Sequence, residues 1–376
     1  MNPPKAISAE RSNRFIKKID FWLGVPLVYL LSAFKTQKPQ APKVRSIAIF
    51  AFAAIGDSIL SSTLFTRLRE LYPEAKITIF SSLANASVYS LLDGFDELII
   101  LPIKNPIASI CEIRRHSIDL LIDTSQWSRI AAVYAALSAA KWTIGFKTDG
   151  QHRHLAYDSN VEHQNDCHEI ENFHRLLTSI RKGSSSAFSV PFAPFQGDIT
   201  TKLKLSRYVV FHPWASGTHS EMREWPLSNW AELGKYLLEQ GVDLLITGGP
   251  QDISRCTQLC SLINGGDHIQ IAAGNFSLQE SAIAIQGTLC TVAVNTGIMH
   301  LSAALGVPTI SLNGPTNASR WGGKGSLVSN ISVPPSEGGA YLNLGFEYPK
   351  NPEYVMNTIT VEQVKNALKD RLHFLV

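Results

Sequence analysis

Short apolar runs alternate with longer segments of helical periodicity along most of this 376-residue chain. One run, residues 46–52, has no polar face, which is typical of a parallel strand covered on both sides. Further runs follow at 76–80, 98–101 and 120–122. Strands that alternate with helices predict a doubly wound parallel sheet with right-handed crossovers, so we expect an α/β fold.

A second alternating set begins at Tyr208 and indicates a second domain. Its strands are expected at 208–212, 243–247, 291–294 and 307–312. The stretch 183–196 holds three consecutive serines, two prolines and a glycine, a composition typical of a linker. The length and an apolar content of 45% suffice for two packed cores. The predicted boundaries are 44–190 and 197–355 for the two domains, with 1–43 before them and 356–376 after them.

Positive charge is concentrated at the amino terminus. Residues 1–45 contain nine lysines and arginines but two acidic residues, a net charge of +7, whereas the remaining chain carries −4. Because a nucleic-acid enzyme normally spreads basic residues over its folded body, we expect no nucleic-acid partner. The five cysteines, an odd number in a chain of this size, predict reduced thiols rather than a disulfide framework.

The most apolar run near the amino terminus is residues 21–34. Its 14 residues would form a helix of about 21 Å, against a bilayer core of about 30 Å, and Pro26 interrupts it. Lysines directly after the run fit a signal peptide poorly. Two alternatives stay open: an anchor on the membrane surface, or a helix packed on the protein body. The basic residues that would face anionic headgroups are Arg11, Arg14, Lys17, Lys18, Lys35 and Lys38.

The first domain offers polar residues where its predicted strands end, which is where functional loops lie in such a sheet. Gly56 and Asp57 follow the first strand, and no G-x-G-x-x-G motif supports dinucleotide binding there. Asp57 is either a helix cap or a catalytic carboxylate, and Asp123 allows the same two interpretations. Five histidines lie within 151–174 without zinc-ligand spacing, so no metal site is expected, and His168 is a candidate to face the functional edge.

Strand ends of the second domain are rich in Gly, Ser, Thr and Asn, which let backbone amides approach an anion. Thr296 and Gly297 begin a predicted helix and form the best candidate phosphate-binding site in the sequence. Arg223 lies close in sequence to Ser216 and could neutralise the same phosphate. Because this domain contains several such loops, we expect it to bind a nucleotide diphosphate.

Motifs in both domains together make a family resemblance visible. They are Ile55-Gly56-Asp57-Ser58-Ile59-Leu60, His212-Pro213, Arg223 with Trp225-Pro226, Gly248-Gly249-Pro250 and Asn295-Thr296-Gly297-Ile298-Met299-His300-Leu301. With these motifs in this order, residues 44–368 resemble the ADP-heptose:lipopolysaccharide heptosyltransferases of glycosyltransferase family 9. The resemblance implies a GT-B fold, in which two Rossmann-like doubly wound domains face an interdomain cleft and the final helix crosses back to the first domain.

The resemblance also implies the chemistry. ADP-heptose would be the donor and an inner-core lipopolysaccharide hydroxyl the acceptor, with inversion, without cofactor or metal, on the cytoplasmic face of the inner membrane. Asp57 would be the general base. The implied donor-site residues are Ser216, Gly217, Arg223, Gly248, Gly249, Gln251, Asp252, Asn295, Thr296, Gly297 and His300. The acceptor-side candidates are Gly56, Asp123, Arg129 and His168.

Two positions depart from the family pattern. Asn295 stands where the family usually has Asp, and Gln251 stands where an acidic residue is usual, although the neighbouring Asp252 is available. Asn keeps hydrogen-bonding capacity but loses the charge, so contacts to the donor sugar can differ. Two other functions therefore stay open: a nucleotide-sugar epimerase on the same fold, and a non-catalytic protein that binds nucleotide sugars.

Overall fold

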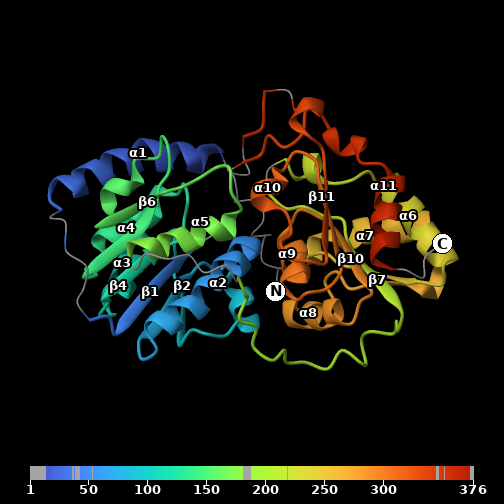
Figure 1. The fold of residues 1–376 in the computed structure, drawn as a ribbon, viewed down its shortest axis with the longest axis horizontal. Coiled ribbons are helices and arrows are strands. Elements are labelled where there is room, and N and C mark those ends of the chain that lie inside the picture. Colours follow the sequence, from blue (N-terminus) through green and yellow to red (C-terminus); the bar gives the residue numbers. More distant parts are fainter. Residues whose placement is uncertain are drawn as a thin grey trace. The chain divides into compact units, whose positions relative to one another are not determined.

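The computed structural model describes residues 14–35, 38, 43–52, 54–180, 188–217, 219–343, 347–350 and 352–372, and only the backbone of residues 14–18. The chain divides into two units, an amino-terminal unit (Ser12–Ala193) and a carboxyl-terminal unit (Pro194–Val376). Each unit is built around one parallel sheet with helices on both faces, as the ribbon shows (Figure 1).

The amino-terminal sheet has the order β3-β2-β1-β4-β5-β6, and all its neighbouring strands are parallel. Its central strand β1 is buried after the first residue, in keeping with an apolar sequence that has no polar face. The strands are β1 (Ser46–Ala51), β2 (Lys76–Ser81), β3 (Glu97–Ile100), β4 (Leu120–Asp123), β5 (Trp142–Lys147) and β6 (Ser159–Glu162). The α-helices after β1 are α2 (Ile55–Leu71), α3 (Pro106–Arg114), α4 (Arg129–Leu137) and α5 (Glu169–Leu176).

The carboxyl-terminal sheet repeats this topology in the order β12-β11-β10-β7-β8-β9, again fully parallel. The strands are β7 (Tyr208–His212), β8 (Asp243–Ile246), β9 (Ile269–Ile271), β10 (Cys290–Val294), β11 (Thr309–Asn313) and β12 (Val328–Ser332). The helices are α6 (Leu227–Glu239), α7 (Ile253–Ile263), α8 (Leu278–Gln286), α9 (Gly297–Ala304), α10 (Ala318–Trp321) and α11 (Val361–Arg371). Two doubly wound sheets confirm the predicted fold class.

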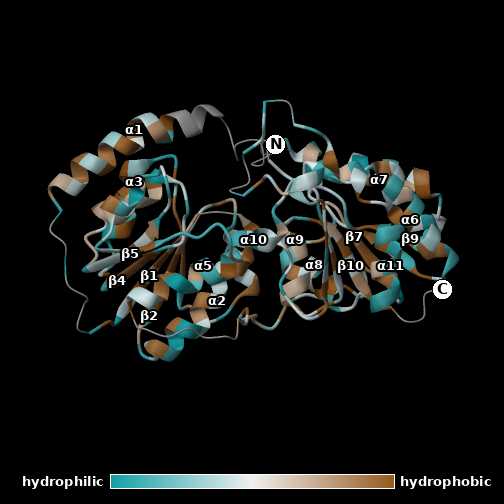
Figure 2. Cartoon of the chain, turned by 45° about the horizontal axis from the view of Figure 1, so that its top comes forward, coloured by the Kyte–Doolittle hydropathy of each residue, from teal (hydrophilic) through white to brown (hydrophobic). Residues whose placement is uncertain are grey.

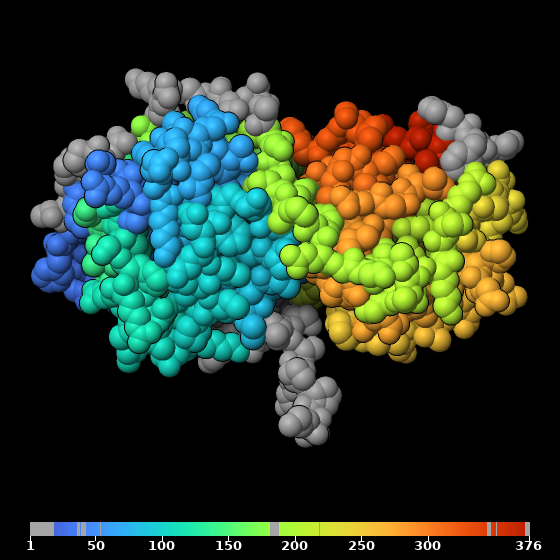
Figure 3. Space-filling view, turned by 90° about the horizontal axis from the view of Figure 1, so that it is seen from below, coloured from blue at the N-terminus to red at the C-terminus, as the bar shows by residue number. Residues whose placement is uncertain are grey.

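The segment after residue 193 runs along the surface of the carboxyl-terminal unit. The amide of Gln196 donates to Gln279 Oε1 at 2.8 Å, and Lys202 pairs with Glu280 at 2.6 Å. Figure 3 shows this lime-coloured stretch lying over the orange part of the chain. Of the predicted linker, residues 181–187 lie outside the described residues.

The final helix α11 packs on the carboxyl-terminal unit instead of crossing back to the amino-terminal one. It contacts α6, β11 and β12. Val361, Val364 and Leu368 lie in the same hydrophobic core as the strands of this sheet. Because these apolar positions recur every three or four residues, one face of α11 is buried there, and the resemblance misplaced this helix.

The amino-terminal helix α1 (Arg14–Ala33) packs along α4 and the 3-10 helix Arg153–Ala156 of the same unit. Packing on the body, one of the two alternatives from the sequence, therefore holds for one face of α1. None of the helices within the described residues combines the length and hydropathy needed to span a bilayer.

Lys35 and Lys38, which follow α1, bind the body of the amino-terminal unit. Lys35 Nζ donates to the carbonyl of Ala156 at 2.6 Å and lies 3.2 Å from a carboxylate oxygen of the buried Asp158. Lys38 Nζ donates to the carbonyl of Ala140 at 2.9 Å. Both ammonium groups thus bind acceptors on the protein body, in agreement with the alternative of a helix that packs on the body.

Candidate donor and acceptor sites

Asp57 lies in the first turn of α2, directly after the carboxyl end of β1. Its Oδ2 accepts a hydrogen bond from the amide of Ala54, the residue that precedes the helix, at 3.2 Å. The capping interpretation is therefore realised. It does not compete with the catalytic one, because a carboxylate accepts through both of its oxygens. The half-buried side chain stays at the carboxyl edge of the sheet, where a substrate hydroxyl would be expected.

Two side chains that the sequence analysis missed support this turn. Asn85 Nδ2 donates to the carbonyl of Ala51 and to Oγ of Ser58, each at 2.7 Å. Tyr89 is buried nearby, and burial, together with the negative charge of Asp57, raises the pKa of its hydroxyl. Both residues follow the carboxyl end of β2, so a search of every strand end would have found Asn85.

Asp123 belongs to a buried network. Its Oδ2 lies 2.7 Å from Arg153 Nη2 and accepts a hydrogen bond from the hydroxyl of Tyr157 at 2.6 Å. The side chains of Asp123 and Arg153 are both 0% exposed. Such a pair needs its partners, because one charge left alone in the interior is costly. This network gives Asp123 a structural role.

The other acceptor-side candidates are also engaged within the protein. Arg129 Nη1 pairs with Asp20 of α1 at 3.0 Å, and its Nε donates to the carbonyl of Gln151 at 3.1 Å. His168 precedes α5, and its Nδ1 accepts from the amide of Ile170 at 3.2 Å, as a helix cap does. Gly56 is buried in the first turn of α2.

The described residues contain no group of three or more histidine, cysteine or acidic side chains that could hold a metal ion. Within the histidine-rich stretch 151–174, His163 lies 3.1 Å from Glu169, and both side chains are buried. His174 contacts Oγ1 of Thr63 at 3.0 Å, and burial lowers the pKa of its imidazole to about 4.

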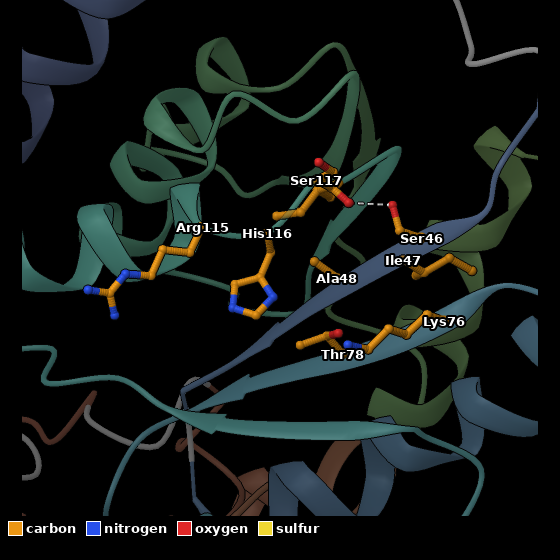
Figure 4. A pocket seen from close by; sticks show the side chains of 9 residues that line it. Ser46, Ile47, Ala48, Lys76, Thr78, Arg115, His116 and Ser117 are labelled. Carbon is orange, nitrogen blue, oxygen red and sulfur yellow. Dashed lines mark hydrogen bonds between the residues drawn. The ribbon is translucent and has the colours of Figure 1, made fainter.

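A pocket of about 190 Å³ opens at the opposite, amino edge of the same sheet. Figure 4 shows Lys76, Arg115 and His116 around it, with a hydrogen bond of 2.6 Å from Ser46 Oγ to the carbonyl of Ser117. Lys76 pairs with a glutamate at 2.8 Å. This pocket lies at the ends where β1 and β2 begin, away from Asp57, so it is not part of the candidate site.

In the carboxyl-terminal unit, Arg223 reaches the loop after β7. It ends the 3-10 helix Ser220–Arg223, and its Nη2 donates to the carbonyl of Ser216, while Gly217 turns the loop with a positive φ of 95°. Nε of Arg223 is buried and has no hydrogen-bond partner among the described residues. A buried donor without a partner is rare in proteins and marks a position that a ligand can satisfy.

The loop after β10 leads into α9 beside the loop after β7, because β10 and β7 are paired, with Ala293 opposite His212. Thr296 is the cap residue of α9, but its side chain makes no capping bond. Its Oγ1 is buried without a hydrogen-bond partner among the described residues. The first amides of an α-helix also have no partner within the helix. Thr296 and Gly297 therefore offer donors to an anion. His300 lies buried one turn further into α9.

Asn295 is held by two acceptors. Its Nδ2 donates to Oδ1 of Asn313 and to the carbonyl of Trp321, each at 2.7 Å. An aspartate could donate to neither. The asparagine therefore matches the local hydrogen bonds of this chain.

The loop after β8 is closed by Asp252. Its Oδ2 accepts from the amide of Gly249 at 2.9 Å and from Nε2 of Gln251 at 3.2 Å. Burial raises the pKa of Asp252. Gly248 has no room for a side chain, since a Cβ there would lie 2.8 Å from Trp214. These contacts shape the loop, and they turn Gln251 toward Asp252.

Glu224 and Arg255 connect these loops, and the sequence analysis missed both. Glu224 accepts a hydrogen bond from the amide of Ala215 at 3.0 Å and forms an ion pair with Arg255. The Arg255 guanidinium stacks 4.1 Å from the ring centroid of Trp214. With Tyr354 and other residues they line an open pocket of about 320 Å³. The position of Glu224, between Arg223 and Trp225 of a quoted motif, was the available signal.

The family model of glycosyltransferase family 9 (heptosyltransferase) matches residues 108–339, more than half of the chain. The chain belongs to glycosyltransferase family 9. A lipopolysaccharide heptosyltransferase 2 of Salmonella typhimurium is 24% identical over 70% of this chain and 81% of its own length. Lipopolysaccharide heptosyltransferase 1 of the same organism is 34% identical, but that match spans 31% of this chain and 37% of the relative.

Solved structures show the same fold. The family 9 glycosyltransferase of Veillonella parvula has a TM-score of 0.70 at 19% identity and covers 90% of this chain and 99% of its own. Escherichia coli ADP-heptose lipopolysaccharide heptosyltransferase II has a TM-score of 0.70 at 18% identity and covers 87% of this chain and 98% of its own. The structure of E. coli heptosyltransferase WaaC with ADP has a TM-score of 0.68 at 20% identity. It covers 87% of this chain and 99% of its own. These likenesses agree with the GT-B class expected for this family 9 member.

Proposed function

We propose that this family 9 glycosyltransferase transfers heptose from ADP-heptose to a hydroxyl of the lipopolysaccharide inner core, with inversion at the anomeric carbon. The observation that carries the proposal is the pair of buried, unpartnered polar atoms at adjoining loops, Arg223 Nε and Thr296 Oγ1. Support also comes from relatives named lipopolysaccharide heptosyltransferases and from a fold shared with WaaC bound to ADP.

The carboxyl-terminal unit would bind the diphosphate of the donor. The amino end of α9 presents Gly297 and the amides after it, and the helix dipole favours negative charge there. Arg223 adds a full positive charge, and Thr296 adds a hydroxyl. As the bond from the anomeric carbon to the diphosphate oxygen breaks, the charge on the departing ADP grows. Donors fixed in advance stabilise that charge in the transition state more than in the bound donor.

The amino-terminal unit would supply the base. The acceptor hydroxyl attacks the anomeric carbon from the face opposite the diphosphate, which inverts the configuration. Asp57 takes the hydroxyl proton as the new carbon–oxygen bond forms, and ADP leaves with the electron pair of the broken bond. The hydrogen bond from the Ala54 amide holds the carboxylate in place. Under this proposal the enzyme works in the cytoplasm, on an acceptor that is anchored in the inner membrane.

Donor binding is the first test. Charged hydrogen bonds contribute about 1.5–3 kcal/mol, so Arg223→Ala is expected to weaken ADP binding roughly 10- to 100-fold. The matched control is Arg207→Ala, because this exposed arginine precedes β7 at the other edge of the same sheet. Calorimetric titration with ADP measures both variants. Equal affinity of Arg223→Ala and wild type would refute the diphosphate site.

Transfer itself is tested by mass spectrometry with ADP-heptose and truncated inner-core lipopolysaccharide. A gain of one heptose on the acceptor is the expected result. Conversion of the donor without acceptor would instead identify a nucleotide-sugar epimerase. Tight donor binding with no product would favour a non-catalytic protein or another donor, which a panel of nucleotide sugars would separate. Such a panel matters because Asn295 and Gln251 differ from the family pattern.

A further inference from the structure

Helix α1 is apolar around its whole circumference over most of its length. Between Ile19 and Phe34, Asp20 is the one charged residue in the sequence. A surface helix of a globular protein normally alternates an apolar face with a charged one. A helix that is apolar all round has to bury both faces, in protein or in another apolar phase.

One face of α1 is buried against the amino-terminal unit. Val28 is fully buried in the core cluster under α4, and Leu31 packs against the same cluster. Gly24 lies so close to Arg129 that a Cβ there would be 2.8 Å from the Arg129 Cβ. Asp20, the charged residue, also faces the body, where it accepts from the amide of Arg129 at 2.9 Å.

The other face exposes large apolar side chains. Trp22 is 71% exposed, Leu23 67%, Leu30 57% and Phe34 82%. Six exposed residues are spaced three or four apart and so form one stripe along the helix: Ile19, Trp22, Leu23, Leu27, Leu30 and Phe34. Phe21 and Tyr29 are also exposed, at 44% and 49%, but they lie beside the stripe, where Phe21 contacts Arg129 and Tyr29 contacts His152. Figure 2 shows α1 on the outside of its unit, with hydrophobic residues along the ribbon. A contiguous exposed apolar patch of this kind marks an interaction surface.

We infer that this stripe docks on the surface of a bilayer that contains anionic lipids, with α1 lying in the plane of the interface. The helix is fixed lengthwise on the body, at its start by Asp20 with Arg129 and towards its end by Lys35, which contacts Asp158. A helix held this way presents its side to a membrane. Trp22 at the stripe suits the boundary between headgroups and acyl chains.

The positive charge that precedes the stripe in the sequence favours a bilayer over other apolar partners. Residues 1–18 contain five basic residues and one acidic residue, directly before the stripe. Basic residues beside an apolar helix face attract anionic headgroups, whereas a second copy of this chain would bring the same positive charge against itself. The stripe between Ile19 and Phe34 adds no acidic residue on its exposed side, since Asp20 faces Arg129.

The position of α1 links docking to the proposed chemistry, and this step rests on the proposed function. Asp20 Oδ1 accepts from the amides of Arg129 and Ile130, at the start of α4. The start of α4 follows the carboxyl end of β4, which is the sheet edge that also carries Asp57. Docking through α1 therefore brings the acceptor edge of this unit near the bilayer that holds a lipid-anchored acceptor.

The test is co-sedimentation of the full chain with vesicles of phosphatidylethanolamine and phosphatidylglycerol. Leu23→Glu places a negative charge in the stripe, and Leu30→Glu does so seven residues further along. The matched control is Ile107→Glu, because Ile107 is an apolar residue of α3 in the same unit that is 77% exposed. We expect wild type and Ile107→Glu to sediment together with the vesicles, and each leucine variant to bind roughly tenfold more weakly.

Two results would overturn the inference. One is equal vesicle binding by both leucine variants and wild type. The other is a dimer in the absence of lipid that Leu23→Glu dissociates, which would make a second copy the occupant of the stripe. Thermal unfolding of each variant verifies the fold, since the replaced side chains are mostly exposed. Transfer to a water-soluble acceptor separates the two proposals, because the leucine variants should retain it even where vesicle binding is lost.

Discussion

At the scale of single residues, the hydrogen bonds of Asn295 favour an amide over a carboxylate at this position. Its amide donates to Asn313 and to the carbonyl of Trp321, and the Asn313 amide is itself committed to the carbonyl of Ser311 at 3.0 Å. The acceptor facing Asn295 is therefore fixed by its own bonds. A carboxylate at this position would face two oxygen acceptors with no proton to share.

Asn295→Asp should therefore destabilise the carboxyl-terminal unit. The variant loses two hydrogen bonds, and its carboxylate faces two oxygen acceptors. We therefore expect the free energy of unfolding to fall by about 1–3 kcal/mol. Denaturant unfolding measures it. The control is Asn275→Asp, at an exposed asparagine of the same unit, which should change stability by less than about 0.5 kcal/mol. Unchanged stability of Asn295→Asp would show that these bonds do not matter.

Sequence spacing predicted some contacts of the site and missed others for a physical reason. Arg223 and Ser216 are seven residues apart, so their contact followed from the short loop between them. The partner of Asp123, Arg153, is 30 residues away, and the partner of Arg129, Asp20, is 109 residues away. Long-range pairs of this kind depend on how the helices pack, which local spacing does not encode.

At the scale of elements, one histidine joins the first two strands of the carboxyl-terminal sheet. His212 ends β7, and its Nδ1 lies 2.8 Å from Oγ1 of Thr247, which directly follows β8. Burial lowers the pKa of His212 to about 4. The neutral imidazole therefore belongs to the folded state, while the unfolded chain takes up a proton below about pH 6.5.

Stability should consequently fall as the pH is lowered from about 6.5 towards 4. The folded pKa is depressed, so the contribution of His212 is present above the unfolded pKa and is lost as the pH falls, by an amount on the order of 3 kcal/mol. His212→Gln keeps a hydrogen-bonding group but cannot titrate. Urea unfolding across this pH range should show a flatter slope for the variant. Identical slopes for variant and wild type would contradict this origin of the acid sensitivity.

Most of the buried strands could be predicted from the sequence, whereas several edge strands could not. The core strands β1, β4, β7 and β10 are continuous apolar runs and were predicted. The edge strands β6, β9 and β12 were missed, because they are short and only partly buried, so their sequences carry no clear apolar pattern. The buried strand β5 was missed as well, because a threonine and a glycine interrupt its apolar residues. The resemblance implied a final helix too, but a sequence cannot tell which of two sheets a helix covers.

At the scale of the whole molecule, the candidate residues divide between the two units. The donor candidates, from Ser216 to His300, belong to the carboxyl-terminal unit, and Asp57 belongs to the amino-terminal one. Each unit has its own sheet and its own hydrophobic core. The sequence predicted this two-part construction from its two alternating sets of strands.

ADP should therefore protect one unit more than the other. We expect hydrogen exchange, followed by mass spectrometry, to slow in peptides that contain the start of α9 and the Ser216 loop. Peptides of α2, which carry Asp57, should exchange as they do without ADP, because ADP alone lacks the transferred sugar and the acceptor. Equal protection of α2 and α9 would contradict the assignment of the nucleotide to the carboxyl-terminal unit.

The central claim is that Asp57 removes the acceptor proton, and transfer by Asp57→Asn tests it most directly. The asparagine keeps an oxygen for the Ala54 amide, so the start of α2 should hold and the ADP affinity should match that of wild type. General-base catalysis contributes about 10²- to 10⁴-fold, so single-turnover transfer from ADP-heptose should slow by at least about 10²-fold. Transfer by Asp57→Asn at close to the wild-type rate would contradict the account.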